Sequence, residues 1–159
     1  MLLNADDVET LSAGAARSPA ALFKAIEDVA TRRVGAGLVT MMRHDAVAST
    51  VERLYSSNHQ AYPVGGKKAK RDTAWGRKVL IEHRVLVSAG DAALRESFDD
   101  HATIIALGLH SCVNVPLVSE GKCIGTLNVC AARSEWNDDE VARVRALGLS
   151  ALAGVLMMK

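Results

Sequence analysis

Apolar residues recur along this chain with two periods, one typical of helices and one typical of strands. Between Ser18 and Gly35 they fall at the i, i+3, i+4 and i+7 positions of a helix. Ser18 is a good N-cap, and the proline that follows it suits the first helical turn because no N–H is needed there. Gly35 is a typical helix stop. The pattern predicts a helix over residues 18–34.

Five stretches are typical of strands. Residues 37–45 and 49–57 are rich in β-branched or large apolar side chains and are separated by a polar turn near Asp45. Residues 109–118 and 123–132 form a predicted hairpin and are apolar on both faces, as central strands of a sheet covered on two sides would be. A shorter strand is predicted over residues 85–88, before Gly90.

Three more helices are predicted in the second half of the chain. Asp72 can cap a helix that runs to His83, and another covers residues 100–107. Asn137 and Glu140 match a capping box that opens a helix to the C-terminus. Residues 146–158 of that helix carry no charge, so we expect it to pack on the sheet and on helix 18–34, a second copy of the chain, or both.

The stretch from residue 59 to 71 breaks the regular pattern. Pro63, Gly65 and Gly66 interrupt it, and four basic residues cluster over 67–71. A mobile, solvated basic loop is expected there, with phosphate binding as the alternative.

Composition excludes several classes of protein. A chain of 159 residues that is 49% hydrophobic is the size of one globular domain, expected over residues 18–159 after an N-terminal segment, 1–17. A formal net charge of +1 gives no field for direct binding of nucleic acid, and no apolar stretch is long enough to span a membrane. With no secretory leader pattern, a cytoplasmic location is expected.

The predicted hairpin carries a recognisable motif. Residues 108–129 read G-L-x-S-x-x-x-V-P-L-x-x-x-G-K-x-I-G-T-L-N-V, and the final helix opens with WNDDEVARVRALG. Together with the order of elements, this resembles the GAF domain family over about residues 20–157. The resemblance implies an α+β fold with a central antiparallel sheet of five to six strands in the order 2-1-5-4-3, plus an extra edge strand in some members. It also implies terminal helices on one face and a ligand pocket under the 60–108 region on the other.

Three cysteines without CxxC spacing favour reduced thiols over a disulfide framework or a zinc site. Cys123 and Cys130 are seven residues apart, so in a regular strand they face opposite sides of the sheet. A three-residue hairpin loop would place Cys112 directly opposite Cys130, whereas a two-residue turn would put them on opposite faces.

The candidate site is the floor of the implied pocket. Asn114 shares strand parity with Cys112, and Asn128 shares it with Cys130, so these side chains can line one face as an uncharged polar floor; a network internal to the sheet is the alternative. Trp75 is a further candidate because its ring can stack on a flat ligand, and Tyr55 and Asp91 are candidates at the rim of the pocket. The predicted ligand-binding residues are Cys112, Asn114, Asn128, Cys130, Trp75, Tyr55 and Asp91. They predict non-covalent binding of an unidentified small molecule by a sensor domain that is a homodimer through its terminal helices, or that acts through a partner; no cofactor or metal is identified.

The sequence also allows alternatives to sensing. A redox enzyme similar to free methionine-(R)-sulfoxide reductase needs cysteines before the hairpin, but residues 1–111 contain none, and Cys112, Asn128 and Cys130 stand where that family has carboxylates. A purely structural dimerisation module remains the other alternative. Tetrapyrrole binding would rest on His101 or His110, neither of which has an adjacent cysteine.

Overall fold

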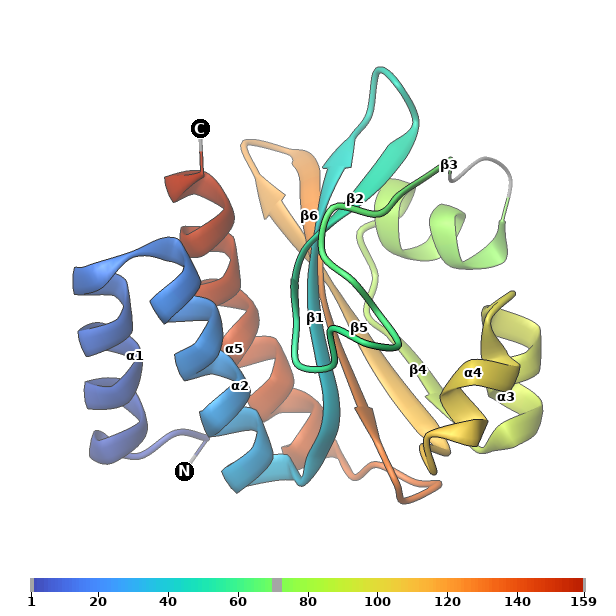
Figure 1. Cartoon of the computed structure of the whole chain (residues 1–159), viewed down its shortest axis with the longest axis horizontal. Helices are drawn as coiled ribbons and strands as arrows, with labels where there is room; N and C mark the ends of the chain where they lie inside the picture. Colours follow the sequence, from blue (N-terminus) through green and yellow to red (C-terminus); the bar gives the residue numbers. More distant parts are fainter. Residues whose placement is uncertain (1, 70–72, 159) are drawn as a thin grey trace.

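A six-stranded antiparallel sheet stands between two layers of helices in the computed structural model, which describes residues 2–69 and 73–158 (Figure 1). The strand order is β3-β2-β1-β6-β5-β4. The strands are β1 (Ala36–Asp45), β2 (Thr50–Ser56), β3 (Lys67–Ala69), β4 (Leu86–Ala89), β5 (Ser111–Ser119) and β6 (Lys122–Ala131). The expected fold class is confirmed, and β3 is the additional edge strand beside β2.

The basic segment 67–71 differs from the expected loop over its described part. Lys67, Lys68 and Ala69 pair with β2 as a short strand, because a polar, exposed edge strand needs neither alternation nor apolar residues. Lys70 and Arg71 lie outside the described residues.

Helices α2 (Pro19–Val34) and α5 (Asp138–Met157) cover one face of the sheet, and α1 (Ala5–Arg17) packs on α2 on the side away from the sheet (Figure 1). Ser18 caps α2 by accepting a hydrogen bond from the Ala21 N–H, and both members of the predicted capping box open α5. The main hydrophobic core lies between these helices and the inward-facing side chains of β1, β5 and β6. A Cβ on Gly154 would lie 2.4 Å from the Phe23 ring, so α5 and α2 pack closely only because this residue is glycine.

The first helix, α1, was not predicted from the hydrophobic pattern. It begins with a capping box in which Asn4 and Asp7 exchange side-chain to backbone hydrogen bonds, and its buried positions are Asp7, Leu11 and Gly14. Two of these three residues are not large and apolar, so the helix shows little hydrophobic periodicity.

The other face of the sheet is covered by three short helices: η1 (Gly76–Ile81), α3 (Asp91–Ser97) and α4 (His101–Ala106). The helix expected over 72–83 is a π-helix in its central part, and Thr73 accepts a hydrogen bond from the Gly76 N–H at its start. The expected cap, Asp72, lies outside the described residues. The seven-residue helix α3 was not predicted because it is too short for a periodic pattern.

The hairpin between β5 and β6 combines a two-residue turn with a β-bulge. Glu120 and Gly121 both have positive φ angles, 51° and 77°, as a type I′ turn requires. Leu117 pairs with Gly125 while Val118 pairs with Cys123, so Ile124 is an extra residue that restores the register. A Cβ on Gly125 would lie 2.3 Å from the Met42 carbonyl oxygen, which explains the glycine at this close approach.

This bulge overturns the expectation that Cys123 and Cys130 face opposite sides of the sheet. Cys123 packs against Trp75 and Val79, and Cys130 packs against Leu94, all of which belong to the layer of short helices. One inserted residue reverses the alternation between the two cysteines, so that both lie on that face.

Among the described residues, no helix has both the length and the apolar character needed to cross a membrane.

Candidate ligand-binding cavity

A cavity lies between the sheet and the layer of short helices, and it opens to solvent at one side. The volume that the centre of a water-sized molecule can occupy inside it is about 70 Å³. Alternate residues of the strands supply the floor, because only every second side chain of a strand points to this face. These floor residues are Leu38, Thr40 and Met42 of β1, Val51 and Arg53 of β2, Cys112 and Asn114 of β5, and Asn128 and Cys130 of β6.

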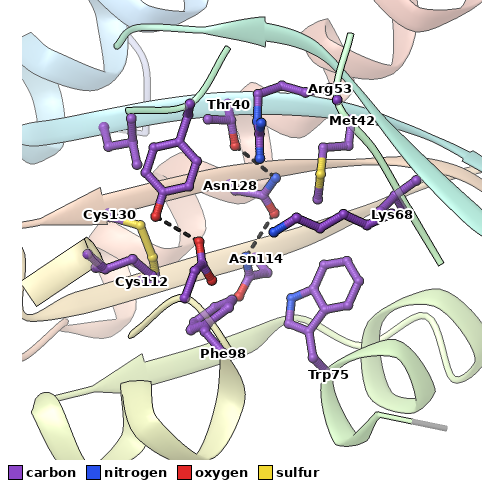
Figure 2. A pocket seen from close by; sticks show the side chains of 16 residues that line it. Thr40, Met42, Arg53, Lys68, Trp75, Phe98, Cys112, Asn114, Asn128 and Cys130 are labelled. Atoms are coloured by element: carbon purple, nitrogen blue, oxygen red, sulfur yellow. Dashed lines mark hydrogen bonds between the residues drawn. A yellow bond between two sulfur atoms is a disulfide. The ribbon is translucent and has the colours of Figure 1, made fainter. Parts of the chain in front are cut away.

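A row of amides and hydroxyls crosses the floor (Figure 2). Asn114 pairs directly with Asn128, and its Nδ2 donates to Asn128 Oδ1 at 2.8 Å. Asn128 Nδ2 donates in turn to the hydroxyls of Thr40 and Thr126, both at 3.1 Å. Asn114 Oδ1 is buried and has no hydrogen-bond partner within the described part of the chain. The sheet therefore satisfies most of this polar row and leaves one buried acceptor without a partner, on a residue that lines the cavity.

Cys112 and Cys130 form another part of the floor. They pair directly across β5 and β6, their Cα atoms are 4.1 Å apart, and a disulfide joins them. The expectation of reduced thiols is therefore wrong for this pair. A two-residue turn alone would put the two cysteines on opposite faces of the sheet, but the bulge at Ile124 shifts the register and places them opposite each other. Cys123 is free and buried, and burial raises the pKa of its thiol.

Charged and aromatic side chains form the remaining walls. The Tyr62 hydroxyl donates to Asp100 Oδ2 at 2.7 Å, and the Arg53 guanidinium lies over the Tyr62 ring, 5.0 Å from its centroid. Burial, followed by the hydrogen bond to Asp100, raises the pKa of Tyr62, so this phenol stays protonated at neutral pH. Lys68 on β3 points into the cavity from its rim, and Trp75 lies below it (Figure 2).

Five of the seven predicted site residues line this cavity, namely Cys112, Asn114, Asn128, Cys130 and Trp75. Tyr55 does not, because a bulge at Leu54 turns it to the opposite face of the sheet. There it packs against Phe23 and hydrogen-bonds to Glu27. Asp91 also lies outside the cavity lining, where it pairs with His110 Nδ1 at 2.6 Å.

The sequence reasoning missed several cavity residues. Thr40 shares strand parity with Leu38 and Met42, so alternation along β1 was a usable signal for it. Arg53, Tyr62, Lys68, Phe98 and Asp100 also line the cavity. Tyr62, Phe98 and Asp100 come from irregular segments whose side-chain directions no periodic pattern indicates. Among the described residues, no group of three or more His, Cys, Asp or Glu side chains is placed to hold a metal ion.

Comparisons with known proteins agree with this architecture. The family model of the GAF domain matches residues 18–153, and the chain belongs to this family. A search of curated protein sequences finds no significant match.

Solved structures show the same fold at low sequence identity. The GAF domain of a phosphoenolpyruvate-protein phosphotransferase from Coxiella burnetii superposes with a TM-score of 0.76 at 14% identity, covering 95% of this chain and 91% of that one. Residues 122 to 287 of a methyl-accepting chemotaxis protein give 0.72 at 17% identity, covering 96% and 97%. The phycocyanobilin-bound GAF domain of a cyanobacterial phytochrome gives 0.69 at 14% identity, covering 98% and 96%.

Proposed function

We propose that this chain is a sensory GAF domain that binds a small molecule non-covalently in the cavity and passes the signal on as a homodimer or through a partner protein. The observation that carries the proposal is Asn114, whose side-chain carbonyl is buried in the cavity floor without a hydrogen-bond partner among the described residues. Leaving such an acceptor unsatisfied costs about 1–3 kcal/mol. A ligand that donates to it removes this cost, so the site favours binding.

The cavity lining combines apolar side chains with a few polar groups, and this composition supports ligand binding over catalysis. Ligand pockets are mostly apolar with a few converging polar groups, and this cavity has that character. The solved neighbours include sensor and phytochrome GAF domains, which supports the sensory class without identifying a ligand for this chain.

Tryptophan fluorescence provides a direct test, because the chain has only two tryptophans and they lie in different places. Trp75 lines the cavity, while Trp136 donates to Ser111 Oγ and packs on the side of the main core. In Trp136→Phe, a fractionated small-molecule extract of the producing cells is expected to change the emission of Trp75. The matched Trp75→Phe protein should not respond to the same fraction. Absence of a response from Trp136→Phe, or equal responses from both proteins, would contradict the proposal.

The disulfide in the floor supports one enzymatic alternative. A reduced Cys112–Cys130 pair can return to the disulfide by reducing a sulfoxide, which releases the thioether and water. This alternative predicts turnover of free methionine sulfoxide with a thiol reductant. It also predicts loss of turnover in Cys112→Ser and Cys130→Ser, whereas a sensor shows no turnover.

A homodimer through the terminal helices is supported by the outer surface of α5. Leu149, Leu156 and Met157 are 73%, 45% and 43% exposed, and Leu149 and Leu156 lie on one stripe of this helix. A second copy of the chain would cover this stripe. The cytoplasmic location and the division into segments 1–17 and 18–159 stay predictions.

A further inference from the structure

From the charges, aromatic rings and free acceptor around the cavity, we infer that its ligand is a small aromatic carboxylate with an N–H or O–H donor on or beside the ring. This inference rests on the proposed function and specifies the ligand class. It combines three independent features of the cavity: its net charge, the free acceptor in its floor and its aromatic walls.

The charge of the lining favours an anion. Among the described residues of the lining, two cations, Arg53 and Lys68, face one carboxylate, Asp100, so this part of the lining carries a net charge of about +1. Lys68 pairs with β2 through its backbone, but its amine makes no hydrogen bond or ion pair with any described residue and points into the cavity (Figure 2). Arg53 donates to the Pro63 carbonyl through one nitrogen, while its buried Nε has no hydrogen-bond partner among the described residues. Both cations therefore retain donors for a ligand.

The same charge balance favours a monoanion over a phosphate ester. A carboxylate neutralises the single excess positive charge, whereas a dianionic phosphate would leave a net negative charge beside Asp100 in a partly desolvated space.

The floor selects the polar group of the ligand. Asn114 is 2% exposed, and its Oδ1 is the acceptor without a partner. A ligand donor is therefore favoured there, and a ligand acceptor would meet the carbonyl oxygen with repulsion.

The walls favour a flat ring. Trp75, Tyr62 and Phe98 line the cavity, so half of the six aromatic residues of the chain gather at this one place. Aromatic faces give a planar ligand a large contact area, and the apolar floor residues beside them need no polar partner.

Isothermal titration calorimetry of the full chain with hydroxybenzoates tests the inference. The probes are the three hydroxybenzoate isomers, with benzoate lacking the donor, 4-hydroxybenzyl alcohol lacking the anion and phenyl phosphate supplying a dianion. At least one hydroxybenzoate is expected to bind about fivefold or more tightly than each of the other three probes.

Two variants assign the two polar interactions. Asn114→Leu should remove the preference for that hydroxybenzoate over benzoate. Lys68→Met, at an exposed rim position, should weaken both carboxylates about three- to tenfold and leave the alcohol unchanged. Lys122→Met is the matched control, because Lys122 lies at the hairpin turn outside this cavity.

The proposed ligand class is contradicted if no hydroxybenzoate binds. It is also contradicted if benzoate, the alcohol or phenyl phosphate binds as tightly as the best hydroxybenzoate, or if Lys68→Met has the same affinities as Lys122→Met. Such a result would leave the proposed function standing whenever the Trp75 fluorescence response to the cell extract persists.

Discussion

Two nearly inaccessible polar residues, Asp7 and Asn114, show how burial can serve stability at one place and binding at another. Asp7 is completely buried, and both of its oxygens are used: Arg32 donates to Oδ1 at 2.8 Å, and Arg33 donates to Oδ2 at 2.7 Å. Its Oδ2 also accepts the Asn4 N–H. Asn114 is 2% exposed and lines the cavity, and its buried side-chain carbonyl has no hydrogen-bond partner among the described residues. Asp7 therefore holds α1 on α2, whereas Asn114 is available to a ligand.

Replacing Asp7 by asparagine is expected to lower the free energy of unfolding by about 1–3 kcal/mol, because two arginines lose their carboxylate. Burial alone would raise the pKa of Asp7, but the hydrogen bonds from Arg32, Asn4 and Arg33 outweigh it and lower the pKa below its usual value. A lowered pKa in the folded state adds stability above the unfolded pKa, which is lost as the pH falls through the folded one.

Urea unfolding at a series of pH values checks both statements. The difference between the wild type and Asp7→Asn should be largest near neutral pH and shrink below about pH 4. Asp6→Asn, at the exposed neighbouring position, is the control and should cost little. A difference that does not depend on pH would contradict the ionic role of Asp7.

The state of the cysteines can be counted chemically. Denatured, unreduced protein should take up one maleimide per chain, on Cys123, and reduced protein should take up three. Reduction should also lower the free energy of unfolding by about 3 kcal/mol, because the bond closes a loop with a sequence separation of 18 residues. Uptake of three maleimides without reduction would show that the pair is not oxidised.

At the scale of the elements, two β-bulges decide which side chains reach the cavity. The bulge at Ile124 puts Cys123 and Cys130 on one face, and the bulge at Leu54 removes Tyr55 from the cavity. Each inserts one residue into a strand, and one residue is enough to reverse the side-chain alternation beyond it.

Gly125 is the glycine next to the first bulge, and its replacement tests the close approach of β6 to β1. Gly125→Ala is expected to cost about 2 kcal/mol or more, because the new methyl would meet backbone, the Met42 carbonyl oxygen, which no side-chain rotation can relieve. Gly66→Ala is the control, since its nearest atom is 3.5 Å away. Equal urea midpoints for the two variants would contradict the packing described for β6.

The sequence predicted the elements whose signal is periodic or has a distinct cap. These elements are helix α2, with Ser18 and Gly35 at its ends, the capping box of α5 and the hairpin strands. The strand order came from the GAF resemblance. Helix α1 was missed because one of its three buried residues is an ion-paired aspartate. Tyr55 was expected in the site but packs on the opposite face of the sheet, because a bulge leaves no signal in the hydrophobic pattern.

At the scale of the whole molecule, helices α2 and α5 and the three short helices lie on opposite faces of one sheet (Figure 1). The main core lies under α2 and α5, and the cavity lies on the side of the short helices. The buried stripe of α5, which includes Val144, Leu147 and Ala151, packs in the main core, while Leu149 and Leu156 face outward. This arrangement leaves the outward stripe available for self-association without covering the mouth of the cavity.

Leu149→Glu is expected to convert a dimer to a monomer, because it places a charge in the centre of the apolar stripe. Leu107→Glu, an exposed leucine after α4, is the control and should leave the mass unchanged. Sedimentation equilibrium of both variants gives the answer. A wild-type protein that is monomeric at high concentration, or a Leu149→Glu protein that stays dimeric, would contradict the proposed interface.

The most direct test of the central claim is native mass spectrometry of the freshly purified chain beside its denatured mass. A retained small molecule predicts a mass excess that disappears on denaturation and is absent from Asn114→Leu, whose cavity floor lacks the free carbonyl. The same excess in wild type and Asn114→Leu would place the molecule elsewhere. Identical native and denatured subunit masses, with no fluorescence response of Trp75 to the cell extract, would contradict ligand sensing and favour a structural dimerisation module.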